Sequence, residues 1–182
     1  MTVSSENIPA PVRRPCLPDS LRLHGRRGLT IVELAVAVTI VGILAAISVP
    51  LSRKIIVTTK GDAVLNDLRV FSGSFQAYVH ERGDWPAGSA AGVFPTGMDG
   101  YLRQSNWTRV TPIGGKYYWN PNSVQNGTRY RAVIVLATVS PNSVTTDTNQ
   151  LLAIDRAIDD GNLATGNFQL GTSNYPIYIL ER

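Results

Sequence analysis

The sequence predicts an α+β protein in which a long N-terminal α-helix packs on a small antiparallel β-sheet head. Three observations give this prediction. An apolar run leads into amphipathic helical periodicity, β-branched and aromatic residues concentrate in the second half, and a stretch rich in glycine and proline separates the two. The length of 182 residues fits one compact domain plus a membrane-spanning segment.

The segment 29–51 contains 23 residues and one charged side chain, that of Glu33. As an α-helix it would be about 34 Å long, enough to cross a hydrocarbon core of about 30 Å. Pro50 lies near its end and predicts a kink or a loosening of the helix there. Residues 1–28 carry five arginines and two acidic residues, so this end is expected to stay in the cytoplasm while the rest is exported.

The net charge of +4 belongs mostly to residues 1–28, because the rest of the chain carries 12 basic and 11 acidic residues. The exported part therefore gives no support to nucleic-acid binding. Cys16 is the one cysteine, so residues 29–182 can form no disulfide among themselves. They contain one histidine, His80, and no phosphate-binding glycine loop or His/Cys metal motif. We expect no enzymatic activity and no cofactor other than, at most, a calcium ion.

Residues 26–34 (Arg-Arg-Gly-Leu-Thr-Ile-Val-Glu-Leu) resemble the prepilin cleavage and methylation motif of type IV pilins and type II secretion pseudopilins. The residues that match are Gly28 at the end of a basic leader, the hydrophobic Leu29, and Glu33 within apolar sequence. This resemblance implies that a prepilin peptidase cleaves between Gly28 and Leu29 and then N-methylates Leu29. It also implies a pilin-like fold and a role for Glu33 in assembly with other subunits.

The resemblance implies three parts: a cleaved cytoplasmic leader at 1–28, a transmembrane and filament-core helix at 29–51, and a periplasmic head at 52–182. The protein would be a structural subunit of a type IV pilus or a type II secretion pseudopilus. It would span the bacterial inner membrane once and later join a periplasmic or surface filament. The sequence does not separate these two classes, although the short head and the absent disulfide favour a pseudopilin.

The alternative is a periplasmic binding protein or enzyme that stays anchored in the membrane without cleavage. A plain anchor explains the basic flank and the length of the apolar run. It gives no reason for Glu33, because a carboxylate at the centre of a membrane helix costs about 2.5–3.5 kcal/mol, although less near its end.

After Pro50 the helix is expected to continue to about Arg82 and to stop at Gly83. One apolar stripe recurs at spacings of three and four residues and should cover the core of the head. Its members are Val64, Leu68, Phe71, Phe75 and Tyr78. Residues 83–106 then form a long loop, with Trp85 and Phe94 expected to anchor it to the core.

The sheet is expected to follow this loop. The predicted strands are Trp107–Thr111, Gly115–Asn120, Arg129–Val139, Phe168–Leu170 and Pro176–Leu180. Arg129–Val139 has the longest β-branched run, which predicts a central strand buried on both faces toward its end. A turn from Pro121-Asn122 to Asn126-Gly127 favours a hairpin before it. A second helix, capped by Asp147 or Thr148 and ended by Gly161, should bury Leu151, Leu152, Ile154 and Ile158.

The end of this second helix is acidic. Asp155, Asp159, Asp160 and Asn162 offer oxygen ligands for calcium, which takes six to eight of them. Some pseudopilins bind calcium near their C-terminus, so the resemblance implies a calcium site as one interpretation of this segment. The spacing differs from the D-x-[DN]-x-[DN]-G calcium loop, and a helix C-terminus with a glycine cap is the other interpretation.

Overall fold

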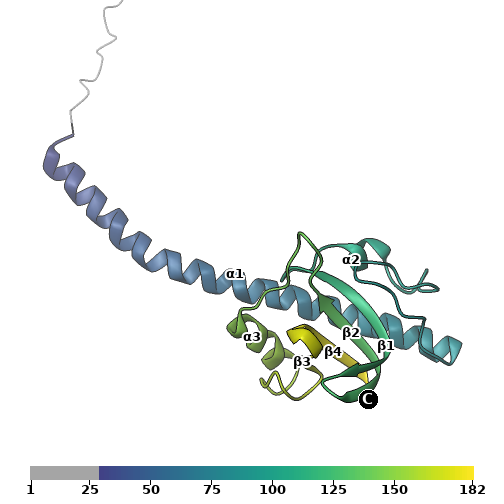
Figure 1. Ribbon diagram of the computed structural model, residues 1–182. Coiled ribbons are helices and arrows are strands. Elements are labelled where there is room, and N and C mark those ends of the chain that lie inside the picture. The colour runs from purple at the N-terminus through teal and green to yellow at the C-terminus, as the bar shows by residue number, and fades with distance from the viewer. Residues whose placement is uncertain (1–28) are drawn as a thin grey trace, which may run out of the picture. The chain divides into compact units, whose positions relative to one another are not determined.

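The computed structural model describes residues 29–182 and confirms the α+β, pilin-like arrangement of a long helix on a small antiparallel sheet (Figure 1). The elements in chain order are α1 (Ile31–Arg82), α2 (Gln104–Thr108), β1 (Lys116–Gln125), β2 (Thr128–Ala137), α3 (Thr148–Ile158), β3 (Phe168–Leu170), the short 3-10 helix η1 (Thr172–Asn174) and β4 (Pro176–Glu181). The chain divides into two compact units, of which the second covers Ala45–Arg182. The leader and Gly28 lie outside the described residues.

In the first unit, the described residues are Leu29, Thr30 and the start of α1 up to Leu44, and every one of them is exposed. Ile31 is 87% and Ile40 53% exposed in the isolated chain. A continuous apolar surface of this kind is typical of a segment that contacts a membrane or another protein. Within residues 29–182, α1 is the one helix long and apolar enough to cross a membrane. It continues through Pro50, and the kink there stays a prediction.

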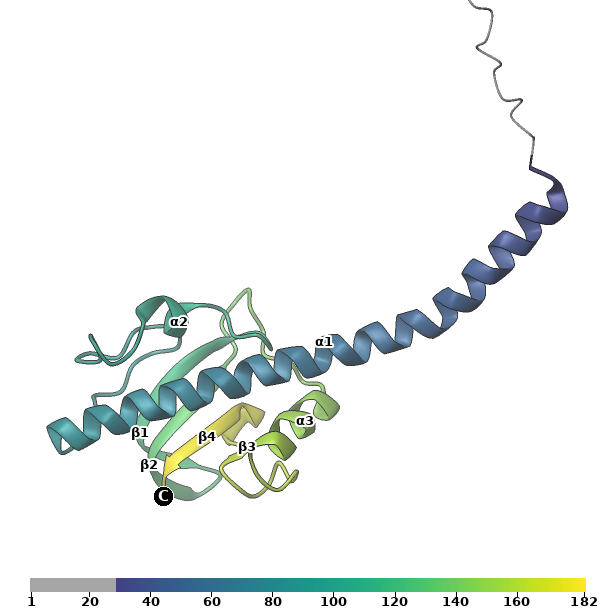
Figure 2. The ribbon, with the colours of Figure 1, turned by 180° about the vertical axis from the view of Figure 1, so that it is seen from behind.

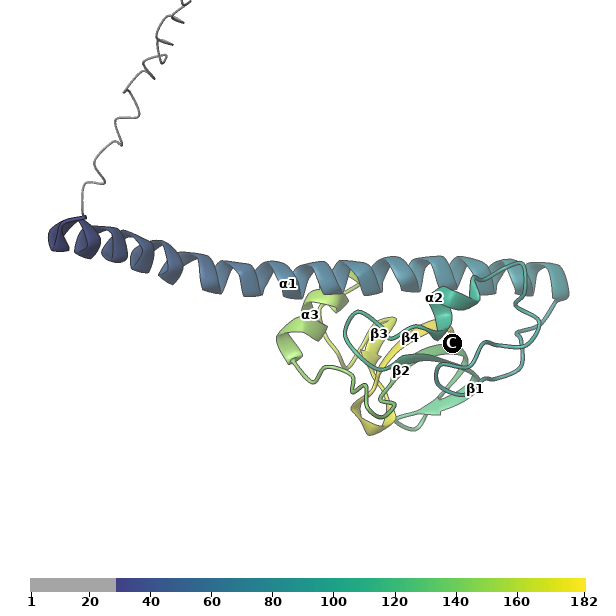
Figure 3. The same ribbon diagram turned by 90° about the horizontal axis from the view of Figure 1, so that it is seen from above.

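In the second unit, the C-terminal part of α1 lies along one face of the sheet (Figure 3). The apolar stripe is confirmed: Val64, Leu68, Phe71 and Phe75 are fully buried, and Tyr78 is partly buried against the same core. Phe75 stacks on Trp119 of β1 with ring centroids 3.9 Å apart. The helix ends at Arg82 because Gly83 takes a φ of +83°, which favours glycine.

The sheet has the strand order β1-β2-β4-β3, and every neighbouring pair is antiparallel. Asn126 and Gly127 join β1 to β2 with positive φ at both residues, which confirms the predicted hairpin turn. In β2, five of the last six residues are nearly inaccessible and the sixth is 9% exposed, as predicted for a central strand. Seen from behind, β4 lies between β2 and β3, with α3 beside β3 (Figure 2).

Two predictions about local structure were wrong. Trp107–Thr111 is not a strand, because Trp107 lies in α2, where its indole N–H donates to the carbonyl of Val93 at 2.9 Å. The helical turn directs this large ring into the core beside Phe71 and Phe75. Pro121 is not in the turn either, because β1 runs on to Gln125. An edge strand tolerates proline, whose missing N–H is not needed on the unpaired side.

A buried carboxylate ties α1 to the sheet. Asp67 is 6% exposed, and its two oxygens accept from the Arg109 guanidinium at 2.7 and 2.6 Å. The hydroxyl of Tyr117, a fully buried residue of β1, donates to Asp67 Oδ2 at 2.7 Å. Burial and the adjacent Asp67 carboxylate raise the pKa of the Tyr117 hydroxyl, so that it remains a donor.

The second predicted helix is α3, and Asp147 is its N-cap. Asp147 Oδ1 accepts from the backbone N–H of Asn149 at 3.0 Å. Leu151 and Ile154 are buried as expected, whereas Leu152 and Ile158 are half-buried. The helix approaches α1 closely at Gly61, where an added Cβ would lie 3.2 Å from Ile154 Cγ1.

Candidate functional site

The residues predicted to act in maturation and assembly lie at the start of α1. Leu29 is exposed and precedes the first helical turn. Thr30 accepts from the backbone N–H of Glu33 at 3.2 Å through its hydroxyl, and Thr-x-x-Glu is the pattern of a capping box. Glu33 also lies in the first turn, where the helix dipole favours a carboxylate. The Thr30 hydroxyl therefore caps the start of α1, a role that the sequence reasoning missed, and the Glu33 carboxylate lies where the helix dipole stabilises it.

The side chain of Glu33 is exposed among exposed apolar neighbours. A carboxylate in this setting is hydrated in the isolated chain. It would require a cationic partner if the surrounding apolar surface were covered by protein or lipid. The start of α1 therefore combines a large exposed apolar surface with one carboxylate, and this carboxylate restricts which groups can cover the surface.

A second group of candidate residues lies where α3 ends. The structure brings Asp155, Asp159 and Asp160 together, and one carboxylate oxygen of each lies within 4.8 Å of the others. Asp155 belongs to the last turns of α3, and the other two follow the helix. Asn162, the fourth predicted ligand, lies in the next loop, where its side-chain oxygen already accepts from the Ala164 N–H at 3.2 Å.

Asp159 and Asp160 hold the loop that follows α3. Asp159 Oδ2 accepts from the backbone N–H groups of Asn167 and Phe168, and the loop passes so close that a Cβ at Gly166 would lie 2.3 Å from it. Asp160 accepts from the N–H of Asn162 at 2.9 Å and from the Thr165 hydroxyl at 2.6 Å. Two of the three carboxylates therefore have structural roles without any ion.

Asp155 differs from its two neighbours. It is fully buried, and neither of its carboxylate oxygens has a hydrogen-bond partner. Burial and the adjacent carboxylate of Asp159 raise the pKa of Asp155 to about 7. Burial also acts to raise the pKa of Asp159, but the adjacent Asp155, which takes up the proton of the pair, and hydrogen bonds from the backbone N–H groups of Asn167, Asp160 and Phe168 hold it below its ordinary value. Near neutral pH this site therefore favours a proton or a cation at Asp155.

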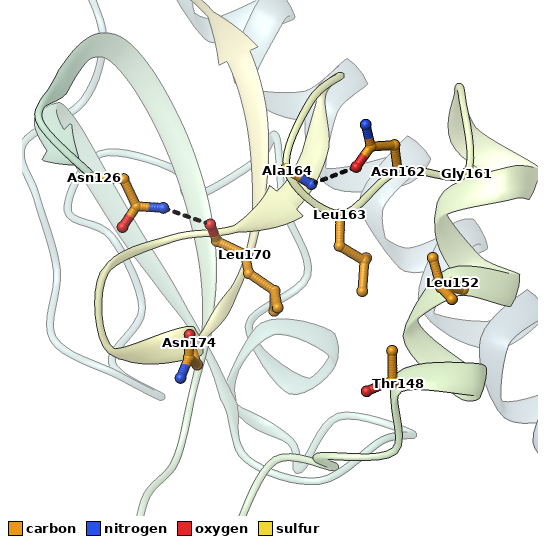
Figure 4. Close-up of a pocket in the computed structure, with 9 residues that line it drawn as sticks. All are labelled: Asn126, Thr148, Leu152, Gly161, Asn162, Leu163, Ala164, Leu170 and Asn174. Atoms are coloured by element: carbon orange, nitrogen blue, oxygen red, sulfur yellow. Dashed lines mark hydrogen bonds between the residues drawn. The ribbon is translucent and has the colours of Figure 1, made fainter.

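A cavity of about 540 Å³ opens beside the same loop (Figure 4). Its walls come from α3, from the loop after it, from β3, from η1 and from the β1–β2 turn. The lining residues are Asn126, Thr148, Leu152, Gly161, Asn162, Leu163, Ala164, Leu170 and Asn174. This cavity could not be predicted from the sequence, because its residues come from five separate segments and share no spacing or charge.

The start of α1 matches a sequence motif of known proteins. Residues 23–49 match the prokaryotic N-terminal methylation motif, a match that includes Leu29 and Glu33 and ends within the apolar helix. The chain thus carries the prepilin-type methylation motif on a pilin-like fold. A 75-residue stretch is 29% identical to the fimbrial protein EcpC of Eikenella corrodens.

This match covers 41% of the present chain and 49% of EcpC, so the chain spans about half the length of the curated relative it matches. No solved structure matches the chain. The motif and the fimbrial relative together support a pilin-like subunit, a class of structural proteins that are usually not enzymes.

Proposed function

We propose that this protein is a structural subunit of a type IV pilin-like filament. The observation that carries the proposal is the coincidence of the methylation motif at 23–49 with a helix start whose side chains are all exposed. An apolar surface of this kind needs a membrane before assembly and neighbouring subunits after it. Under this proposal the protein has no catalytic role.

Maturation of the precursor follows from the same motif. A prepilin peptidase cleaves between Gly28 and Leu29 and methylates the new amino group of Leu29. Before this step the protein crosses the inner membrane once, with the arginine-rich leader in the cytoplasm and the head in the periplasm. Residues 1–28 are then the removed leader, 29–51 the membrane and filament-core helix, and 52–182 the head.

Glu33 then has a role in assembly. The amino group of Leu29 is cationic near neutral pH, and N-methylation leaves it basic. In a filament core this cation and the Glu33 carboxylate of a neighbouring subunit would pair. An unpaired buried charge is strongly destabilising, so the pair selects the axial position of one subunit against the next.

The type of filament is the finer question. Type IV pilins and type II secretion pseudopilins share the motif. The name of the fimbrial relative favours a pilus, whereas the short head without a disulfide favours a pseudopilus. The alternative from another class is a binding protein or enzyme that stays anchored without cleavage.

The decisive experiment is intact-mass and N-terminal peptide mass spectrometry on the protein from its native membranes. We expect a chain that begins at Leu29 and carries one additional methyl group. A chain that retains residues 1–28 in cells with an active prepilin peptidase would refute the proposal and favour the anchored protein.

Replacing Glu33 tests the assembly step separately. Glu33→Ala should insert into the membrane and be cleaved like the wild type, but it should give few filaments because the Leu29 ammonium loses its partner. Glu33→Gln is the matched control for the charge, since it keeps the size and polarity of the side chain and should also assemble poorly. A normal filament yield from either variant would contradict the charge pairing.

Calcium at the acidic cluster is a second proposal, supported by the buried Asp155 carboxylate that has no partner. Asp155, Asp159 and Asp160 would supply carboxylate oxygens, and a divalent cation would compensate the charges that these three residues bring together. Calorimetric titration should give a binding heat with calcium that is lost in Asp155→Asn. The absence of heat at millimolar calcium would end this proposal without affecting the first.

A further inference from the structure

A groove lies between α1 and the start of α3, within the second compact unit. Its volume is about 340 Å³, and its exposed lining is mostly apolar. The lining residues are Lys54, Val57 and Thr58 from α1 and Asp147, Asn149 and Ala153 from α3 and its cap. The two helices touch at Gly61, where α3 brings Ile154 against α1, and the groove lies on the N-terminal side of this contact.

The chemistry of the groove restricts what can fill it. Val57 and Ala153 present apolar surface, whereas the exposed Lys54 has no ion-pair partner among residues 29–182. The carboxylate of Asp147 is already used to cap α3. An occupant that satisfies the groove therefore presents aliphatic side chains together with one carboxylate.

The start of α1 has this combination. Its side chains from Leu29 to Leu44 are all exposed, nearly all are apolar, and Glu33 is the one carboxylate among them. Glu33 and Val36 are three residues apart, as are Lys54 and Val57. Two parallel copies of α1 can be displaced by 21 residues, or about 32 Å, along the helix axis. Glu33 of one copy then lies at the height of Lys54 of the other, and Val36 lies at the height of Val57.

We propose that the groove between α1 and α3 receives the start of α1 from a second copy of this chain, with Glu33 of that copy against Lys54. The inference rests on the proposed filament function, which supplies the parallel orientation of the copies. A carboxylate has two oxygens, so Glu33 can accept from Lys54 of one neighbour and from the Leu29 ammonium of another. Asp147 also lines the groove. Two cations, Lys54 and the Leu29 ammonium, would then lie near two carboxylates, those of Glu33 and Asp147.

Cysteine cross-linking in assembled filaments tests this placement. Cys16 lies in the leader that maturation removes, so the mature variants contain only the cysteines that are introduced. A disulfide requires Cα atoms about 4.4–6.8 Å apart, which adjacent levels of two packed helices allow. We expect cross-linked dimers from Val36→Cys combined with Val57→Cys or with Thr58→Cys. Each single variant, and Val36→Cys combined with Val70→Cys on the distal part of α1, should give none.

Charge reversal at Lys54 provides a readout without cysteines. Lys54→Glu should lower the filament yield at least tenfold, because it places a second carboxylate beside Glu33 in an apolar contact. Lys60→Glu is the matched control, since Lys60 is an exposed lysine of the same helix outside the groove, and its yield should stay within twofold of the wild type.

Filaments that assemble from the cysteine variants without a cross-link at either pair would overturn the inference and leave the filament function standing. A normal filament yield from Lys54→Glu would overturn it as well. A wild-type protein that is never cleaved and forms no filaments would instead refute the proposed function, so the two failures are distinguishable.

Discussion

Removing the carboxylate of Asp67 should destabilise the head more than any exposed substitution on the same helix. Asp67→Ala leaves the fully buried Tyr117 hydroxyl without an acceptor, which costs about 1–3 kcal/mol. The Arg109 side chain is 45% exposed and can be hydrated instead, so the lost ion pair adds only about 0–1 kcal/mol. The expected loss in the free energy of unfolding is therefore about 1–4 kcal/mol.

The assay is denaturant unfolding of the full chain in detergent micelles, followed by tryptophan fluorescence. All three tryptophans lie in the head, and two of them are fully buried. Tyr117→Phe should cost about 1–2 kcal/mol, and the double variant should cost less than the sum of the single ones, because both remove the same hydrogen bond. Asp62→Ala, on the exposed face of α1, is the control and should stay within about 0.5 kcal/mol. Strictly additive effects, or equal costs at positions 67 and 62, would refute the reasoning.

Two further predictions concern the acidic cluster. Because the pKa of Asp155 is raised to about 7, its contribution to stability is complete below about pH 4 and is lost as the pH rises through 7. Asp155→Asn should therefore raise the melting temperature relative to the wild type at pH 8 in the presence of EDTA, and this advantage should disappear toward pH 5. Gly166→Ala should lower the free energy of unfolding by about 1–3 kcal/mol, because φ is +84° and the new Cβ would clash with Asp159. Gly73→Ala, in open space on α1, should instead be neutral or stabilising by up to about 1 kcal/mol.

The long helix and the order of the elements could be predicted because each depends on a local pattern. Phe71, Phe75 and their stripe follow helical spacing, and Asn126-Gly127 has the backbone preference that a hairpin turn requires. The burial of β2 could be predicted from its run of β-branched and other apolar residues. In each of these cases the residues themselves carry the physical cause of the structure.

The wrong predictions and the omissions concern features that depend on contacts between residues far apart in the sequence. Alternation around Trp107 suggested a strand, but the space beside Phe71 and Phe75 favours a helical turn that buries the indole. Asp67 looked like one polar residue among others on α1, and only Arg109 and Tyr117, more than 40 residues away, explain its burial. The three aspartates were predicted as a group, but the burial of Asp155 without a hydrogen-bond partner depends on the packing of the folded chain around it.

The sheet order β1-β2-β4-β3 has a consequence for damaged or unfinished chains. The last strand, Pro176–Glu181, occupies an interior position, and Glu181 accepts from the indole of Trp85 and from Arg131. A chain that is cut before Pro176 would leave β2 and β3 with open edges and the buried Ile177 missing. A truncated head would therefore lack the strand that joins β2 to β3, so its sheet would be incomplete. We expect such a chain to be degraded rather than assembled into a larger structure.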